Sequence, residues 1–378
     1  MTMSKHGWTY KKLGDLTTTI NGLWTGKKPP FVNVAVVRNT NFTKDCKLDM
    51  TNVAFLNVEQ NQYVTRKLYP GDIIVEKSGG SDKQPVGRPV LFNISDGEYS
   101  FSNFTSTLRI STNEISSTFL HKVLFAKYLQ GVTCKMQSKT TGIRNLNFKA
   151  YKSLEIPVPP MGEQEAIVAE LDEINSAVDE LKLQVADLGT LAQATFYDMF
   201  GDPVTNPKAW PVKKLGEVCF LKAGKNIKAS ELSQKPSEGL YPCYGGNGIR
   251  GYIAKKSHEG CFPIIGRQGA LCGNVVLATG SFYATEHAVV CQPLEELNTI
   301  FLFFALKEMN LNQYAKGVAQ PGLAVSSITP LFLPIPPMPL QQEFAARVKA
   351  IEEAKAELKA QMADMQALLA SRMQYWFD

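Results

Sequence analysis

The sequence predicts a mixed α/β (α+β) protein: two mixed α/β modules separated by two long antiparallel coiled-coil helices, arranged as an internal pseudo-twofold repeat. Three observations support this fold class. They are an internal duplication, a sustained heptad pattern in each copy, and short strands that alternate with helices between the duplicated segments. A chain of 378 residues is long enough for two to four compact units.

The duplication is visible at both ends of each copy. Trp8–Leu16 (WTYKKLGDL) recurs as Trp210–Val218 (WPVKKLGEV), 202 residues later. Ile156–Phe200 matches Leu333–Phe377 without a gap, at an offset of 177 residues. Each copy therefore contains an opening strand, a variable middle, a Pro-rich hinge and a long helix. The second middle is shorter by 25 residues, the difference between the two offsets.

The long helices follow from apolar residues that recur at alternating spacings of four and three, the pattern of a coiled-coil seam. Each helix begins after a Pro-Pro pair and is expected to have about 38 residues, hence a length of roughly 57 Å. Lys355 and Arg372 interrupt the second seam. The apolar seam residues are Ile167, Leu171, Ile174, Val178, Leu181, Val185 and Leu188 in the first helix, and Phe344, Val348, Ile351, Leu358, Met362, Met365 and Leu369 in the second.

The two seams are expected to pair with each other. Residues 162–200 carry a net charge of −8, whereas the second helix has basic residues that attract such a partner: Arg347, Lys349, Lys355 and Lys359. Copies that alternate module and helix close most simply around a pseudo-twofold axis, which makes the helices antiparallel. The length of the seam favours a spacer; the alternative is a two-helix hairpin without functional meaning.

The variable middles are predicted to be mixed α/β. The first should contain strands at 72–76 and 107–110 and a helix at 117–129; the second should contain strands at 262–265 and 288–291 and a helix at 298–309. The expected domains are a first module at 1–155, a hinge and helix at 156–203, a second module at 204–332, and a hinge and helix at 333–378.

Charge and composition indicate the class of partner. The net charge is only +5, but residues 17–150 carry 17 Lys/Arg against 9 Asp/Glu, a net of +8, and residues 218–332 carry a net of +3. A surface of that kind suits a polyanion. No run of eighteen apolar residues exists, and the seven scattered cysteines form no Cys-x-x-Cys pair. We therefore expect a cytoplasmic protein without a membrane partner.

This plan resembles the specificity subunit of Type I restriction–modification systems, and the resemblance covers essentially the whole chain. It rests on the hinge Ile156–Glu165 (IPVPPMGEQE) with its copy at Leu333, and on the junction Met199–Trp210 (MFGDPVTNPKAW). Gly71–Gly79 and Tyr244–Gly251 are weaker marks. The resemblance implies two target-recognition domains, each reading half of a split site in double-stranded DNA. It also implies helices that bind two copies of a modification subunit, an adenine methyltransferase, and a restriction/translocase subunit that joins the complex.

The catalytic motifs of such partners are missing from the sequence. An adenine methyltransferase needs an Asn/Asp-Pro-Pro-aromatic loop, and Lys28–Phe31 (KPPF) offers a donor where an acceptor is required. Neither a Gly-rich cofactor loop nor a Walker A loop is found, and the four histidines lie far apart. We therefore expect no catalytic site, no cofactor and no metal. Two alternatives remain: a fragment of a fused restriction–modification enzyme, and a coiled-coil adaptor that binds protein partners.

Candidate DNA contacts are polar residues in Gly-rich loops, because bases are read by Arg, Lys, Asn and Gln while Lys and Ser position phosphates. In the first module they are Lys77, Ser81, Lys83, Gln84 and Arg88, followed by Lys135, Gln137, Lys139 and Arg144. In the second module they are Asn247, Arg250, Arg267, Gln268, Lys316 and Gln320. The sequence does not indicate which of these face bases.

Overall fold

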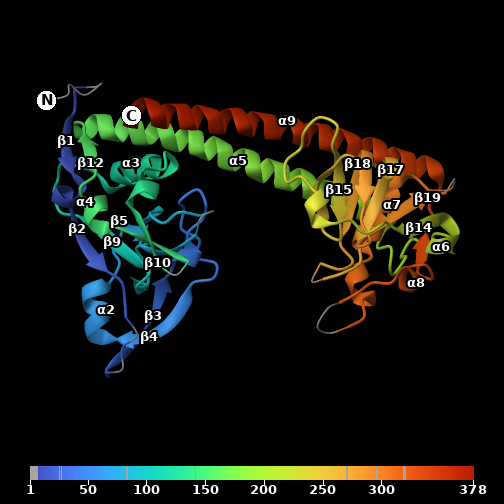
Figure 1. Cartoon of the computed structure of the whole chain (residues 1–378), viewed down its shortest axis with the longest axis horizontal. Helices are drawn as coiled ribbons and strands as arrows, with labels where there is room; N and C mark the ends of the chain where they lie inside the picture. The colour runs from blue at the N-terminus through green and yellow to red at the C-terminus, as the bar shows by residue number, and fades with distance from the viewer. Residues whose placement is uncertain are drawn as a thin grey trace. The chain divides into compact units, whose positions relative to one another are not determined.

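The structure is a computed structural model that describes residues 7–378 except 25, 27, 82–83, 141, 270, 295–296 and 318–320 (Figure 1). The chain divides into two compact units. Unit 1 comprises Met1–Glu180 together with Met362–Asp378, and unit 2 comprises Leu181–Gln361. Each long helix therefore contributes one part to each unit.

Unit 1 holds the opening segment, the first variable middle and the first hinge. Its elements are β1 (Thr9–Lys12), α1 (Leu13–Leu16), β2 (Thr17–Asn21), β3 (Phe31–Val37), η1 (Asn39–Asn41), β4 (Ala54–Glu59), α2 (Gln60–Arg66), β5 (Asp72–Glu76), β6 (Ser78–Gly80), β7 (Pro89–Phe92), β8 (Tyr99–Phe101), β9 (Thr105–Ile110), α3 (Ser117–Leu129), η2 (Val132–Met136), β10 (Gln137–Thr140), β11 (Ile143–Leu146), α4 (Phe148–Lys152), β12 (Glu155–Val158) and the start of α5 (Met161–Phe200).

Unit 2 holds the corresponding second set. Its elements are β13 (Val212–Lys214), α6 (Leu215–Val218), β14 (Cys219–Ala223), η3 (Ala229–Glu231), β15 (Tyr241–Gly245), β16 (Gly248–Ile253), β17 (His258–Gly266), β18 (Val275–Ala284), β19 (Ala288–Pro293), α7 (Thr299–Glu308), η4 (Leu311–Tyr314), α8 (Val325–Ile328), β20 (Phe332–Pro334) and the start of α9 (Met338–Phe377).

The predicted elements of the variable middles are confirmed. Strand β5 and helix α3 have the predicted bounds, while β9, β17 and β19 extend the predicted strands by two to five residues. Helix α7 lies within the predicted helix at 298–309 because Asn298 is its N-cap, with Oδ1 accepting from the Ile300 amide at 2.9 Å. Both long helices begin directly after a Pro-Pro pair, as predicted, and have 40 residues each.

The two modules share a strand order that their sequences do not reveal. Unit 1 contains a four-stranded sheet, β2-β9-β5-β7, and a three-stranded sheet, β4-β3-β8. Unit 2 contains one six-stranded sheet, β14-β19-β17-β18-β15-β16. The ten-residue β18 serves both parts: it pairs antiparallel with β17 and parallel with β15, as β7 pairs with β5 and β8 with β3. The duplication therefore extends through the variable middles at the level of topology.

In each copy the opening segment pairs with the hinge of the same copy. Strand β1 runs antiparallel to β12, and β13 runs antiparallel to β20. Each opening strand leads into one helical turn whose two leucine or valine side chains are buried, Leu13 and Leu16 in unit 1 and Leu215 and Val218 in unit 2. These paired segments close each module next to the Pro-Pro pair at which its long helix begins.

The core of each unit forms where one short helix packs between a sheet and the long helices. In unit 1, α3 contributes Phe119 and Val123 to a core that also contains Ile73 of β5, Leu171 of α5 and Phe377 of α9. In unit 2, α7 does the same beside an aromatic cluster of the two long helices. The Phe196 ring lies 5.6 Å from that of Phe344, and the Phe200 ring lies 4.8 Å from that of Phe301.

A buried glutamine fixes the start of each long helix, and the pair obeys the 177-residue offset. Gln164 donates from Nε2 to the carbonyl of Pro159 at 2.9 Å and accepts from the amide of Ser116 at 2.9 Å. Gln341 donates to the carbonyl of Pro336 at 2.8 Å and accepts from the amide of Asn298 at 2.8 Å. Ser116 and Asn298 are the N-caps of α3 and α7, so each glutamine ties a module helix to its hinge.

The seam residues face inward, but the charged residues act differently from the expectation. Every apolar seam residue is buried or half-buried, and burial is deepest toward the modules. Arg347, Lys349 and Lys355 form ion pairs with glutamates of their own helix, which lie three or four residues away. Arg372, expected only to interrupt the seam, instead reaches α5: its Nη2 lies 3.1 Å from Glu170 Oε2.

Candidate nucleic-acid interface

Two polar runs of the first module, predicted separately, form one small sheet. Strand β11 lies between β10 and β6, with Arg144 opposite Gly80 and Asn145 opposite Ser78. The hydroxyl of Ser78 donates to Asn145 Oδ1 at 2.6 Å, and the Leu146 amide donates to the Lys77 carbonyl at 2.8 Å. The hairpin of β10 and β11 therefore pairs with β6, the short strand in the segment that follows β5.

The first-module candidates differ in how they present their side chains. Ser81, Gln84 and Lys135 are exposed, and Gln137 and Arg144 are half-buried. Lys77 is half-buried, donates to Asn21 Oδ1 at 3.2 Å, and has its pKa lowered by burial. Lys139 belongs to β10, but its side chain is not described, and Lys83 lies outside the described residues.

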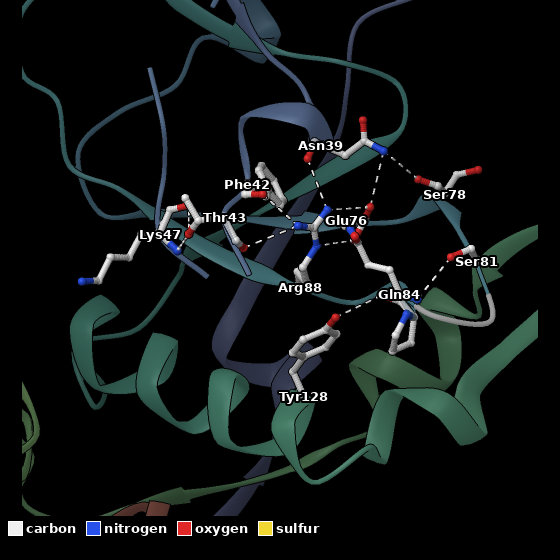
Figure 2. A network of polar contacts seen from close by, with 11 residues as sticks. Asn39, Phe42, Thr43, Lys47, Glu76, Ser78, Ser81, Gln84, Arg88 and Tyr128 are labelled. Atoms are coloured by element: carbon white, nitrogen blue, oxygen red, sulfur yellow. Dashed lines mark hydrogen bonds and ion pairs between the residues drawn. The ribbon is translucent and has the colours of Figure 1, made fainter. Parts of the chain in front are cut away.

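Arg88 differs from the expectation of a loop cation that offers its donors to DNA, because its side chain is buried at 4% exposure. Its Nε donates to Glu76 Oε2 at 2.8 Å and its Nη2 to Glu76 Oε1 at 3.1 Å, a bidentate pair (Figure 2). The remaining donors face the carbonyls of Asn39, Phe42 and Thr43. Burial lowers the pKa of Arg88, but the hydrogen bonds and charge of Glu76 outweigh it and raise that pKa overall.

The loop that receives these bonds was missed by the sequence analysis. The loop after β3 lines a hollow of about 470 Å³ with Asn39, Thr40, Phe42, Thr43 and Lys44, together with Glu76, Gly79, Ser81, Gln84 and Arg88. A side chain at Gly79, which has a φ of 97°, would come within 2.8 Å of Asn39 Nδ2, so the two loops touch. The sequence feature that could have indicated this loop is the polar run 38–44 (RNTNFTK), which directly follows an apolar strand.

The second-module candidates also gather at strand ends. Asn247 and Arg250 are exposed in the turn and strand that follow β15, and Asn274 donates to Asn247 Oδ1 at 3.2 Å. A side chain on Gly266, at the end of β17, would lie 1.8 Å from the Gly246 carbonyl oxygen. The backbone of one loop thus rests directly on the other, which only glycine permits.

A third loop of unit 2 joins the same group. Gln268 and Lys316, both exposed, form β-bridges to Gly322. This arrangement repeats, in shorter form, the way in which β11 joins β10 to β6. Arg267 is half-buried and donates from Nη1 to the Glu286 carbonyl at 3.4 Å. Gln320 lies outside the described residues.

Within the described part of the chain, no group of three or more His, Cys, Asp or Glu side chains is placed to hold a metal ion. No described helix combines the length and the apolar character needed to cross a membrane.

Comparison with known sequences identifies a family and several relatives. The family described as Type I restriction modification DNA specificity domain matches residues 5–185 and 207–364. The EcoprrI specificity subunit of Escherichia coli is 38% identical over 224 residues, which cover 56% of this chain and 56% of that subunit. The MjaX specificity subunit assigned in Methanocaldococcus jannaschii is 20% identical over 92% of this chain and 87% of its own length. The alignment thus spans only about half of the EcoprrI subunit.

Two solved structures share the fold. The S subunit of a Type I restriction–modification system from M. genitalium superposes with a TM-score of 0.58 at 16% identity, covering 100% of this chain and 98% of that one. A chain from a structural study of complex assembly in the type I R-M system gives a TM-score of 0.59 at 17% identity, covering 100% and 99%. The family match includes most of both units, and this chain belongs to the Type I restriction modification DNA specificity family.

Proposed function

We propose that this protein is the DNA sequence-reading subunit of a Type I restriction–modification enzyme, without a catalytic site of its own. The observation that carries the proposal is that two modules of one strand order each gather exposed polar side chains beside their central strands: Ser81, Gln84 and Lys135 in the first, and Asn247, Arg250, Gln268 and Lys316 in the second. Family membership and the +8 charge of residues 17–150 support it. Each module would read one half of a bipartite site.

The proposed partners are two copies of an adenine methyltransferase subunit and a restriction/translocase subunit. One solved relative comes from a study titled for complex assembly of the type I R-M system. In this proposal the chain recognises the DNA sequence. The methyltransferase subunits transfer a methyl group from S-adenosylmethionine, and the restriction subunit translocates and cleaves the DNA.

The proposed domains are residues 1–155 and 204–332 for the two target-recognition domains, with 156–203 and 333–378 as hinges and helices. We propose that the helices form an antiparallel coiled coil related by a pseudo-twofold axis. In support, Glu170 near the start of α5 accepts from Arg372 and Trp376 near the end of α9, within unit 1. Within unit 2, Phe200 at the end of α5 lies 5.3 Å, ring to ring, from Phe344 near the start of α9.

The proposed DNA contacts are the exposed or half-buried candidates of each module. They are Lys77, Ser81, Gln84, Lys135, Gln137 and Arg144 in the first, and Asn247, Arg250, Arg267, Gln268 and Lys316 in the second, together with Lys83, Lys139 and Gln320, whose side chains are not described.

The test is a reconstitution with methylation-sensitive sequencing of DNA. The purified chain alone should neither methylate DNA nor bind S-adenosylmethionine. With partner subunits it should direct adenine methylation to one bipartite sequence. Methyl transfer by the chain free of partners would establish the fused-enzyme alternative instead. Failure to bind DNA in a complex that still assembles would favour the protein adaptor.

A further inference from the structure

The hollow of the first module is built around a buried ion pair between Glu76 and Arg88, and the position of Glu76 is occupied by a glycine in the second module. By sequence alignment of Ile73–Gly80 with Pro263–Ala270, Gly266 stands where Glu76 stands in the first module. In unit 2 the loop after β15 rests on Gly266 directly, backbone to backbone. In unit 1 the loop after β3 is held away from β5 by two side chains, Glu76 and Arg88, which bridge the gap (Figure 2).

The bridging pair has no donor left for a ligand. Nε and both terminal nitrogens of Arg88 are bonded to Glu76 and to three carbonyls of residues 39–43. Glu76, 1% exposed, also accepts from Asn39 Nδ2 at 3.4 Å. The guanidinium fork therefore fixes the position of one wall of the hollow relative to the other.

The side chains at the rim of the hollow, unlike the buried ion pair, are exposed to solvent. Thr40, Lys44, Ser81 and Gln84 line it and are exposed. The Ser81 amide donates to the Gln84 carbonyl at 2.8 Å, which ties these two residues together. Two hydroxyls, an amide and an ammonium at the mouth of an open hollow are the groups that contact nucleic acid phosphates and base edges.

We propose that this hollow is a DNA-contact subsite of the first module. Lys44 contacts a phosphate there, and the Glu76–Arg88 pair is a positioning device that sets the distance between the two rim loops. The inference rests on the proposed function and deepens it. It adds Lys44 and Thr40 to the recognition surface and assigns Arg88 to holding that surface rather than to reading a base.

The positioning role is tested by removing the pair without leaving a buried charge. Arg88→Met alone leaves Glu76 buried and unpaired, which destabilises the module. The double variant Glu76→Leu/Arg88→Met replaces a buried ion pair by apolar groups of similar volume, a change that is often neutral for stability. It should therefore melt close to wild type, yet lack the Arg88 hydrogen bonds to the carbonyls of Asn39, Phe42 and Thr43.

The readout is the methylated sequence in the complex reconstituted with its partner subunits. The double variant should lose discrimination at the first half-site by about 5- to 100-fold at one or more positions. Discrimination at the second half-site should stay within about twofold and serve as the internal control. A folded double variant that keeps full discrimination at both half-sites would overturn the positioning role. Absence of sequence choice in the wild-type complex would instead reject the proposed function.

The contact role is tested with a matched pair of exposed lysines. Lys44→Ala should weaken DNA binding by the complex uniformly across sequences and reduce the slope of log affinity against log salt by about 1. Lys149→Ala, on α4 outside the hollow, should leave both unchanged. Equal effects of the two substitutions would mean that Lys44 adds only general positive charge, and the subsite assignment would be wrong.

Discussion

At the scale of single residues, two buried glutamines, Gln164 and Gln341, connect each module to the start of its long helix. Each is fully buried and makes hydrogen bonds from both ends of its amide. Gln341→Ala leaves the Asn298 amide and the Pro336 carbonyl without that partner. The cost of a buried unsatisfied group predicts a loss of about 1–3 kcal/mol in the free energy of unfolding.

The neighbouring Gln342 is exposed and provides the matched control. Chemical denaturation of the Gln341→Ala and Gln342→Ala variants should show a loss for the first only. Gln164→Ala should likewise lower the free energy of unfolding, since Gln164 is the counterpart of Gln341 in the first copy. If Gln341→Ala were as stable as wild type, the glutamine would not secure the hinge.

His121 should make the stability of unit 1 depend on pH. Burial, followed by the charge of Lys122, lowers the pKa of its imidazole from 6.5 to about 4. The unfolded chain then binds a proton at a pH where the folded chain does not. Stability is therefore fully present above pH 6.5 and falls as the pH drops toward 4, by up to about 3 kcal/mol.

Carboxylates also titrate in this range, so the contribution of His121 must be measured as the difference between wild type and a variant without this histidine. The free energy of unfolding should be followed from pH 7 to pH 4 for wild type and for His121→Gln. The variant should lose less stability over that interval, whereas parallel curves would show that His121 does not cause the dependence.

At the scale of elements, the end of α9 is part of the first module's core. Trp376 stacks on Trp8 with centroids 6.0 Å apart and donates to Glu170 at 3.0 Å, and the Phe377 ring lies 5.7 Å from Phe119. Trp376→Ala should therefore destabilise unit 1 by about 1–3 kcal/mol, less than a fully buried Trp, because the side chain is half-buried.

Hydrogen exchange locates that effect. Amides of α3 should exchange faster in the Trp376→Ala variant, while those of α7, in unit 2, should not change. Gln374→Ala, an exposed position of the same helical turn, should leave both helices unaffected. Equal acceleration in α3 and α7 would mean that the end of α9 serves both units alike.

Elements differ in how far the sequence predicts them. The bounds of α3 and β5 were predictable because an N-cap, an apolar run and a following glycine or charge mark them locally. The sheet of β6, β10 and β11 was not, because Asn145 and Ser78 are 67 residues apart and their pairing depends on tertiary packing. Arg88 resembles an exposed loop cation in sequence, since its burial depends on carbonyls of a distant loop.

At the scale of the whole molecule, the shared strand order favours two modules that read DNA independently. Replacing residues 17–150 by the corresponding middle of a relative exchanges every rim loop of the first module and none of the second. Methylation-sensitive sequencing of the reconstituted complex should then show one altered half-site and one unchanged half-site. A change in both halves would mean that the modules do not act separately.

The long helices are proposed to act as a ruler between the half-sites. Modules related by a pseudo-twofold axis read the same face of a duplex when their half-sites lie about one helical turn, or about 10 bp, apart. If each module reads about 3–5 bp, the unread gap between them is roughly 5–8 bp. The gap should then depend on the length of the helices and not on the loops that read bases.

Lengthening both helices tests this directly. Four residues inserted after Val185 and four after Met362, positions that correspond at the 177-residue offset, add about 6 Å to each helix. That is just under the rise of two base pairs at about 3.4 Å each. Because four residues depart from the heptad, local unwinding should absorb part of the length. The unread gap should therefore grow by about 1–2 bp while both half-site sequences stay unchanged. An active complex with an unchanged gap would show that the helices join the modules without setting their spacing.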